Sequence, residues 1–260
     1  MKLKLYQVDA FAEKLFSGNP AGVCPLEQWL PDDLMQNIAM ENNLAETSFF
    51  VKEGDKYHIR WFTPLVEVDL CGHATLATSH VIFNYTGYGK DKIHFISRSG
   101  DLFVRKTGEI IILNFPTDKF ERSETPIALV EGLGIAPLET YKGLTDFMLV
   151  YKDQEQIEKM QPDLRLLSRA ISRGVIVTAK GNDCDFVSRF FAPRAGIDED
   201  PVTGSAHTTM IPYWHKKLGK TEMTARQLSK RKGFLHCKYL DDRVEIGGKA
   251  QTYLSGEIEV

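Results

Sequence analysis

Two stretches of this chain place acids, histidines and small residues where a helix is expected to begin. The first reads EVDLCGHATLAT over residues 67–78, and the second reads DEDPVTGSAH over residues 198–207. The first backbone N–H groups of a helix have no partner inside it, and the helix dipole favours negative charge there. Such a place suits a carboxylate ligand, or the carbanion or enolate left by proton removal. The candidate substrate-binding residues are Gly72, Ala74, Thr203 and Gly204.

The two stretches belong to a longer internal repeat. RWFTP at residues 60–64 recurs as RFFAP at residues 189–193, and each is followed by a Glu, then by a Cys or Thr and by Gly-x-Ala. The Arg residues are 129 positions apart, whereas the Glu, Gly and Ala residues are 132 apart, which indicates a short insertion in the second copy. For one copy alone, close packing of a helix on a strand explains the small residues equally well. The repetition favours a duplicated domain and a functional site.

A proton-transfer site needs an acid or a base. The candidates near the two helix starts are His73, Asp200, Ser205 and His207. Glu46 is a further candidate, because NLAETSFFV places it among apolar residues where a helix gives way to a strand. Burial there penalises the ionised form, so we expect the pKa of Glu46 to be raised towards the working pH. The competing interpretation is a Glu on the solvent face of a strand.

Other kinds of site find less support in the sequence. Cys71 and His73 could bind a metal ion, but two ligands are too few for a metal site. GKT at Gly219 lacks the earlier Gly of a phosphate-binding loop, and GLGIAP at Gly132 lacks the third Gly of a dinucleotide fingerprint. Ser205 does not lie in a G-x-S-x-G nucleophile elbow. We therefore expect no metal and no cofactor.

Composition bounds the kind of protein that carries these residues. The 260 residues suffice for one large or two medium domains, and 43% apolar with 26% charged residues is ordinary for a globular chain. A net charge of -3 gives no reason to expect nucleic acid or an anionic membrane as partner. No apolar run approaches the ~18 residues of a membrane helix. The first residues, MKLKLYQVDAF, alternate like a strand rather than forming a signal peptide, so we expect a cytoplasmic protein with reduced cysteines.

The elements that must position the site alternate between short strands and a few helices. Each half of the chain reads as several strands with one long helix, which is an α+β pattern. We expect the long helices over HATLATSHVIFNY and SAHTTMIPYWHKKLG, with Pro212 limiting or kinking the second. SGNPAGV at residues 17–23 reads as a loop, and PDLRLLSRAI at residues 162–171 reads as a helix.

Five motifs together give the chain a resemblance to a known family. SGNPAGV, AETSFF, RWFTP, DLCGHATLAT and DEDPVTGSAH occur in this order and spacing in the PhzF-like proteins of phenazine biosynthesis, which have the diaminopimelate epimerase-like fold. The resemblance covers essentially the whole chain. It implies two similar α+β domains, each a curved sheet wrapped around a central helix, related by a pseudo-twofold duplication. We expect the first domain at residues 1–116 and 250–260 and the second at residues 117–249.

The resemblance also implies an activity. Proteins of this kind transfer protons without a cofactor, at a site between the domains, and the likeness suggests a homodimer. By resemblance, Glu46 is the proton-transferring carboxylate, and His73, Asp200 and Ser205 are its partners. The racemases and epimerases of this fold use two cysteines. Here Cys71 stands at the first of these positions but Thr203 at the second, and a hydroxyl is far too weak an acid to replace a thiol.

Three readings of function follow. The leading one is an isomerase that moves a proton on a small carboxylate-bearing metabolite, with Glu46 as the general acid and base. The second is a racemase or epimerase that uses Cys71. The third is a non-catalytic protein that binds small molecules in the same fold, because a fold does not fix a function.

Overall fold

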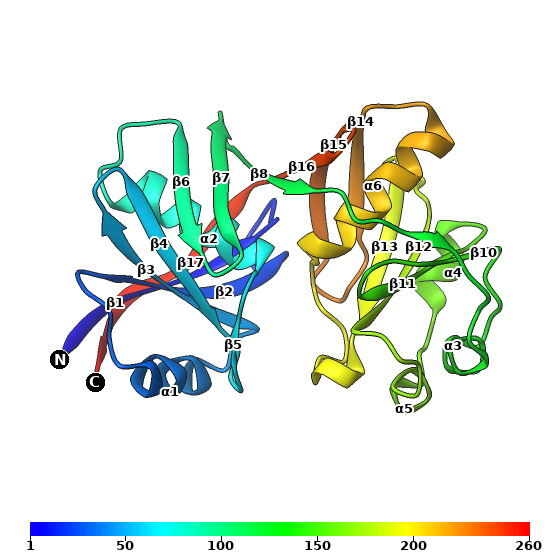
Figure 1. Cartoon of the computed structure of the whole chain (residues 1–260), viewed down its shortest axis with the longest axis horizontal. Helices are drawn as coiled ribbons and strands as arrows, with labels where there is room; N and C mark the ends of the chain where they lie inside the picture. The colour runs from blue at the N-terminus through cyan, green and yellow to red at the C-terminus, as the bar shows by residue number, and fades with distance from the viewer. The chain divides into compact units, whose positions relative to one another are not determined.

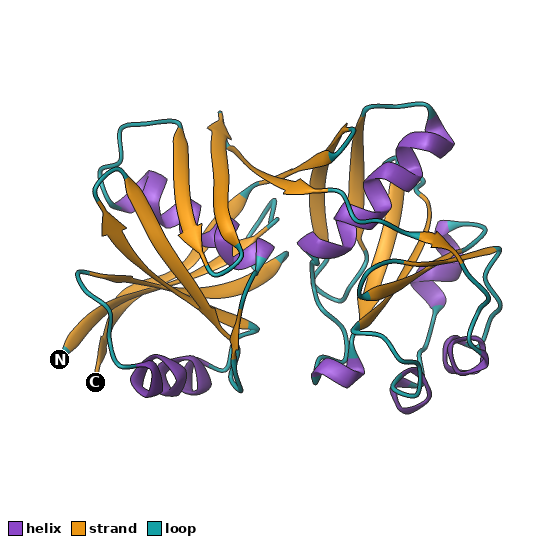
Figure 2. Cartoon of the chain, viewed as in Figure 1, coloured by secondary structure: helices purple, strands orange, loops and turns teal.

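The structure is a computed structural model that covers residues 1–260. In it the chain divides into two compact units, and each unit is described by itself (Figure 1). The first unit comprises Met1–Asn114 and Ile246–Val260, and the second comprises Phe115–Glu245. Strands make up most of the regular structure in both units, and the helices are few (Figure 2). None of the helices combines the length and the apolar character that a membrane-spanning helix needs.

The first unit is a mixed sheet with two helices. In sequence order its elements are β1 (Lys2–Ala10), β2 (Asn19–Leu26), α1 (Asp32–Asn42), β3 (Glu46–Glu53), β4 (Lys56–Phe62), β5 (Glu67–Val68), α2 (Gly72–Tyr85), β6 (Lys92–Ser97), β7 (Gly100–Thr107), β8 (Ile110–Pro116) and β17 (Ala250–Glu259). The sheet runs β17-β1-β2-β3-β4-β6-β7-β8, with β2 parallel to β3 and β4 parallel to β6. The other neighbouring strands in this run are antiparallel.

The second unit repeats this pairing pattern. Its elements are β9 (Glu121–Arg122), α3 (Ile127–Leu133), β10 (Glu139–Lys142), β11 (Asp146–Val150), α4 (Gln154–Lys159), α5 (Leu164–Leu167), β12 (Gly174–Lys180), β13 (Phe186–Phe191), α6 (Gly204–Leu218), β14 (Glu222–Gln227), β15 (Gly233–Leu240) and β16 (Arg243–Gly248), which ends in the first unit. Here β11 is parallel to β12, β12 is antiparallel to β13, and β13 is parallel to β14. The strands β2, β3, β4 and β6 of the first unit therefore correspond to β11, β12, β13 and β14.

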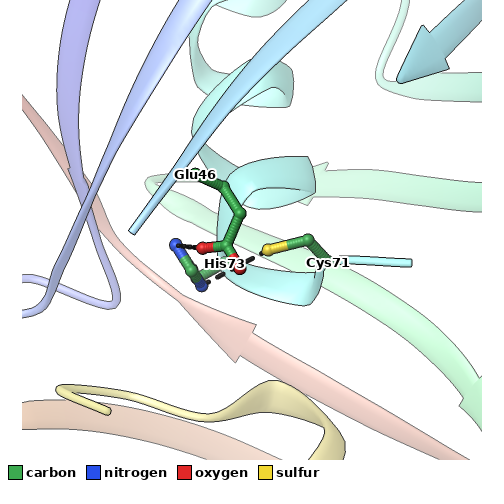
Figure 3. Close-up of side chains that lie close together, drawn as sticks. All are labelled: Glu46, Cys71 and His73. Atoms are coloured by element: carbon green, nitrogen blue, oxygen red, sulfur yellow. Dashed lines mark hydrogen bonds and ion pairs between the residues drawn. The ribbon is translucent and has the colours of Figure 1, made fainter. Parts of the chain in front are cut away.

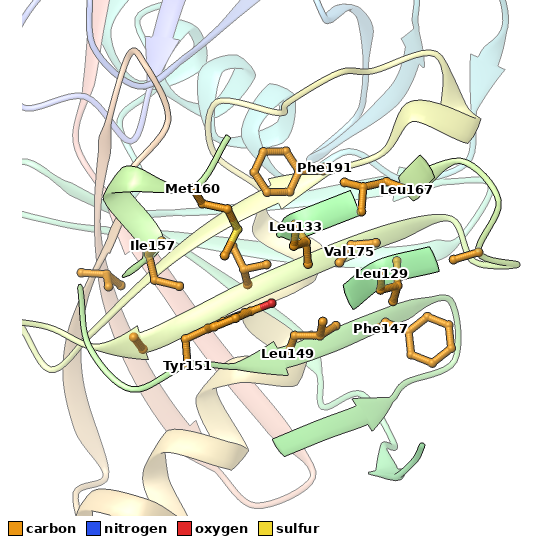
Figure 4. Packing of buried hydrophobic residues seen from close by; sticks show 14 residues of the cluster. Leu129, Leu133, Phe147, Leu149, Tyr151, Ile157, Met160, Leu167, Val175 and Phe191 are labelled. Carbon is orange, nitrogen blue, oxygen red and sulfur yellow. The ribbon is translucent and has the colours of Figure 1, made fainter. Parts of the chain in front are cut away.

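In both units a buried strand lies between helices on its two faces. In β3, Phe49 and Val51 pack with α1, whereas the hydroxyl of Ser48 is hydrogen-bonded to Thr78 of α2 at 2.7 Å. In β12, Val175 and Val177 join the apolar cluster under α3, α4 and α5 (Figure 4). On the other face, Trp214 of α6 donates to the hydroxyl of Thr178 in β12 at 3.0 Å. Alternation along a strand thus sends one set of side chains to each layer.

The repeated Arg and Glu residues have the same structural role in each unit. Arg60 donates to Glu67 with two bonds of 2.7 Å, and Arg189 donates to Glu199 with bonds of 2.7 and 3.1 Å. The guanidinium carbon of each Arg also lies over the ring of an aromatic residue two positions later, 5.1 Å from the centroid of Phe62 and 4.9 Å from that of Phe191. Each pair ties a strand to the segment leading into the long helix.

Two local expectations were wrong. SGNPAGV is not wholly a loop, because β2 begins at Asn19 and pairs with both β1 and β3. The helix expected over residues 162–171 is only the single turn α5. After it, the backbone N–H groups of Arg169 and Ala170 donate three residues back, to Leu166 and Leu167, instead of the four of an α-helix. Pro212 lies inside α6, which continues to Leu218.

Candidate functional site

Strand β3 and helix α2 bring Glu46 and His73 together in the first unit. Glu46 is the first residue of β3 and, like Ser48, points towards α2. His73 is the second residue of α2. Oε2 of Glu46 lies 3.1 Å from Nε2 of His73, and the two side chains are only 12% and 6% exposed (Figure 3). The solvent-facing interpretation of Glu46 does not fit this position.

Two further residues contact the imidazole of His73. Asn19, the first residue of β2, is hydrogen-bonded to Nδ1 of His73 at 3.1 Å. Sγ of Cys71 lies 3.5 Å from the same nitrogen (Figure 3). Because an amide can turn to offer either its oxygen or its nitrogen, Asn19 can serve a neutral or a protonated His73. The imidazole is therefore held at both of its nitrogens.

Charges in this cluster are coupled. Burial is the largest influence on Glu46 and acts to raise its pKa, but the charge of His73 and its hydrogen bond outweigh burial, so the pKa is lowered. Burial acts to lower the pKa of His73, but the Cys71 sulfur and the Glu46 carboxylate raise it well above 6.5. The sequence-based expectation of a raised Glu46 pKa was wrong, because it ignored the cationic partner. Glu46 is ionised and can accept a proton.

Cys71 is a different kind of group from Glu46. It immediately precedes α2, and its side chain is buried. Burial, followed by the charge of Glu46, raises the pKa of its thiol. A thiol with a raised pKa stays protonated at neutral pH and is a poor base.

The start of α6 gathers the predicted residues of the second unit. Thr203 immediately precedes α6, and its hydroxyl donates to the carboxylate of Asp200 at 2.5 Å. Gln227, at the end of β14, accepts from the backbone N–H of Thr203 at 2.9 Å and donates to the carbonyl of Asp200 at 2.7 Å. Gly204 is the first residue of the helix. The acidic turn before the helix is thus fixed by side-chain bonds.

Ser205 occupies the place in the repeat that His73 has in the first unit. Its hydroxyl accepts from Nη2 of Arg173 at 3.0 Å. Arg173 directly precedes β12, and its Nε donates at 2.9 Å to Asp146, the first residue of β11. An Arg–Ser contact therefore stands in the second unit where the first unit has Glu46 and His73.

Sequence reasoning missed four of these residues. Asn19 and Asp146 begin corresponding strands, β2 and β11, but the strand registers match Asp146 with Ala21, so alignment of the repeat beyond the helix starts would not have paired them. Arg173 is adjacent to the position in β12 that matches Glu46, and the same alignment would have shown it. Gln227 comes from a distant strand end, and nothing in its local sequence marks it.

Comparison with known proteins agrees with this architecture. A family model described as phenazine biosynthesis-like protein, PhzC-PhzF, matches residues 8–256. The chain belongs to this PhzC-PhzF family. It is 48% identical over 260 residues to an uncharacterized isomerase of Pseudomonas aeruginosa, with all of both chains covered. It is 50% identical to a PhzF-family phenazine biosynthesis protein of Enterococcus faecalis, whose crystal structure matches with a TM-score of 0.98 over 100% of both chains.

More distant structures extend the likeness of fold alone. A hydroxyproline epimerase of Agrobacterium vitis is 10% identical and matches with a TM-score of 0.62, over 99% of this chain and 91% of its own. The chain thus has a mixed α+β architecture, and this epimerase resembles it in fold. The expected fold class and family are confirmed.

Proposed function

We propose that this protein is an isomerase that moves a proton on a small carboxylate-bearing molecule, with Glu46 as the group that takes and returns the proton. The observation that carries the proposal is the buried contact of Glu46 with His73 at the start of α2. Three relatives, at 48%, 47% and 43% identity over 99–100% of this chain, are named uncharacterized isomerases, which supports the reaction class.

The start of α2 supplies the binding element. The backbone N–H groups of Gly72, His73 and Ala74 come before the first intrahelical bond, which Thr75 donates to the carbonyl of Cys71 at 3.1 Å. These groups and the positive end of the helix dipole favour an anionic group of the substrate. A carboxylate bound there lies beside Glu46, and the enolate formed by proton removal is stabilised by the same groups.

Substrate binding is expected to adjust the basicity of Glu46. In the free protein the charge of His73 holds the pKa of Glu46 down, against a large opposing effect of burial. An anionic substrate that draws the hydrogen bond of His73 weakens this hold, while exclusion of water strengthens the effect of burial. The pKa of Glu46 then rises towards the working pH, where a carboxylate both accepts and returns a proton efficiently.

The turn before α6 and the start of that helix hold two further proposed site residues. Asp200 and Ser205 are proposed to bind or protonate the substrate, as the family resemblance suggests. The hydroxyl of Thr203 donates to Asp200 and so favours its ionised form, in which Asp200 can accept a proton. Because Ser205 accepts from Arg173, its own hydroxyl proton is left to donate elsewhere.

The test is solvent deuterium incorporation into a panel of small carboxylates, followed by mass spectrometry. Wild-type protein should label one member of the panel, and Glu46→Gln should lower the rate by about 10²–10⁴-fold, the usual contribution of a general acid–base group. Circular dichroism checks that the variant is folded. Undiminished labelling by a folded Glu46→Gln variant would contradict the assignment.

Cys71→Ser separates this proposal from a racemase that uses Cys71. The isomerase predicts that Cys71→Ser labels substrate far faster than Glu46→Gln does, since the raised pKa of the thiol makes Cys71 a poor base. Equal losses in the two variants would favour the racemase.

A further inference from the structure

Glu46, Cys71 and His73 offer three metal ligands in one place. One oxygen, one sulfur and one nitrogen atom, one from each side chain, all lie within 4.8 Å of one another (Figure 3). Carboxylate, thiolate and imidazole are the three ligand types that bind zinc in proteins. The sequence showed only Cys71 and His73, and the fold adds Glu46 from β3. We propose that this cluster is a zinc site with three protein ligands.

The spacing of the ligand atoms fits a tetrahedral ion. Zinc bonds of ~2.0 Å to nitrogen and oxygen place these two ligands roughly 3.3 Å apart, and a bond of ~2.3 Å to sulfur places sulfur and nitrogen roughly 3.5 Å apart. Oε2 of Glu46 is 3.1 Å from Nε2 of His73, and Sγ of Cys71 is 3.5 Å from Nδ1. Because a metal takes only one of the two nitrogens, one side chain must shift by on the order of 1 Å.

Nε2 is the nitrogen that the surroundings favour as ligand. Nε2 of His73 and Oε2 of Glu46 lie 3.1 Å apart as a buried ion pair, and a zinc ion would replace the proton between them. Once that proton has left, both atoms are acceptors that converge on one cation. Nδ1 would then keep its proton and donate to the oxygen of a turned Asn19 amide, the kind of outer contact that orients histidine ligands.

The charge of the bound cluster suits a buried site. A divalent ion with one carboxylate, one thiolate and one neutral imidazole has no net charge, and the protons displaced from the ligands pass to solvent. Three protein ligands leave the fourth position to water or a small anion. Zinc would engage Glu46 and stop its proton transfer, so the ion would be a reversible inhibitor. This inhibition rests on the proposed function, whereas the binding does not.

Cobalt(II) provides the test, because its spectrum reports a bound thiolate directly. Chelator-treated full-length protein is titrated with cobalt(II), and a thiolate-to-cobalt charge-transfer band should appear with one equivalent. Zinc should abolish the band by competition. Cys71→Ser should lose the band and bind zinc at least tenfold more weakly. His73→Gln should also bind zinc at least tenfold more weakly. A band that survives in Cys71→Ser, or no band in the wild type, would overturn the proposal.

The matched control is Cys184→Ser, which removes a thiol in the second unit. Cys184 is less buried than Cys71, so a non-specific thiol complex would form there first. The band should be unchanged in Cys184→Ser, and its loss there would contradict the site. If the protein incorporates deuterium but gives no cobalt band, only the zinc site is refuted. If it gives the cobalt band but incorporates no deuterium, only the proposed function is refuted.

Discussion

At the scale of single residues, His207 is the side chain whose burial most directly links folding to pH. It is fully buried in α6, and burial lowers its pKa from 6.5 to about 4. A lowered pKa means that the contribution to stability is complete above pH 6.5 and is lost as pH falls towards 4. The full loss is about 3 kcal/mol, from 1.36 kcal/mol for each pKa unit.

The prediction is that His207→Phe weakens the acid sensitivity of folding. Phenylalanine fills similar space beside Phe186, whose ring centroid is 6.0 Å from that of His207, and it cannot take up a proton. Urea unfolding at pH 7.5 and pH 5 should show a smaller difference in the free energy of unfolding than in wild type. His80 keeps part of the difference, because burial also lowers its pKa to about 4. An unchanged pH difference would show that His207 is not the group concerned.

The stability that His73 contributes through its pair with Glu46 should be lost as pH rises, whereas that of His207 is lost as pH falls. The pKa of His73 is raised, so its contribution to stability is present below pH 6.5 and is lost as pH rises through its folded pKa. The pKa of Glu46 is lowered, so its contribution is present above pH 4.5 and is lost in more acidic solution. The pair is therefore complete between these two values.

Glu46→Gln tests this coupling without any substrate. Removal of the carboxylate leaves burial as the larger influence on His73, so the NMR titration of its ring should move to lower pH. His207 of the second unit, whose pKa burial lowers to about 4, is the reference and should titrate identically in both proteins. Identical titration of His73 in both would show that Glu46 does not sustain its charge.

At the scale of elements, the repeated Arg–Glu pairs position the segments that lead into the long helices. Besides its pair with Glu199, Arg189 donates to the carbonyls of Ile157 and Met160 at the end of α4, at 3.2 and 2.7 Å. One side chain thus connects β13, α4 and the turn before α6. Because the pair is largely buried, removal of either partner leaves polar groups unpaired.

We predict that Glu199→Gln lowers the free energy of unfolding of the second unit by about 2 kcal/mol, the range for a buried hydrogen bond to a charged group. Native-state hydrogen exchange of β13 amides measures this loss within that unit. The control is Glu155→Gln, which breaks the exposed pair of Glu155 with Lys159 and should change stability by less than about 0.5 kcal/mol. Equal effects in the two variants would mean that the Arg189 pair is not structural.

At the scale of the whole molecule, the duplication could be predicted from the sequence because the motifs that indicate it are local. RWFTP and RFFAP, with the Gly-x-Ala that follows each, fix a strand end and a helix start, and these need no long-range contact to be recognised. Other features depend on residues brought together from distant segments. The pKa direction of Glu46 depends on His73, which comes from another element, and the role of Gln227 depends on β14 reaching the start of α6. Sequence patterns alone carry no such distances.

The two copies differ at the position of Glu46. The register of β12 against β13 matches that of β3 against β4 and places Gly174 where Glu46 stands. The structure gives a reason for the glycine. A Cβ atom on Gly174 would lie 2.2 Å from the ring of Phe190, a distance that no real contact shows. The guanidinium of Arg173 lies on the same ring, 5.5 Å from its centroid. A side chain at position 174 would therefore require the ring of Phe190 to move.

This steric argument predicts that Gly174→Ala destabilises the second unit by about 1–3 kcal/mol, the usual cost of overpacking. Phe190→Leu removes the ring and should itself be destabilising, because Phe190 is buried. If the clash is the cause, the double variant should lose less than the sum of the two single losses. Urea unfolding of all four proteins completes the cycle. Additive losses would mean that the glycine is required for another reason, and that the second copy lacks a Glu46 equivalent without steric necessity.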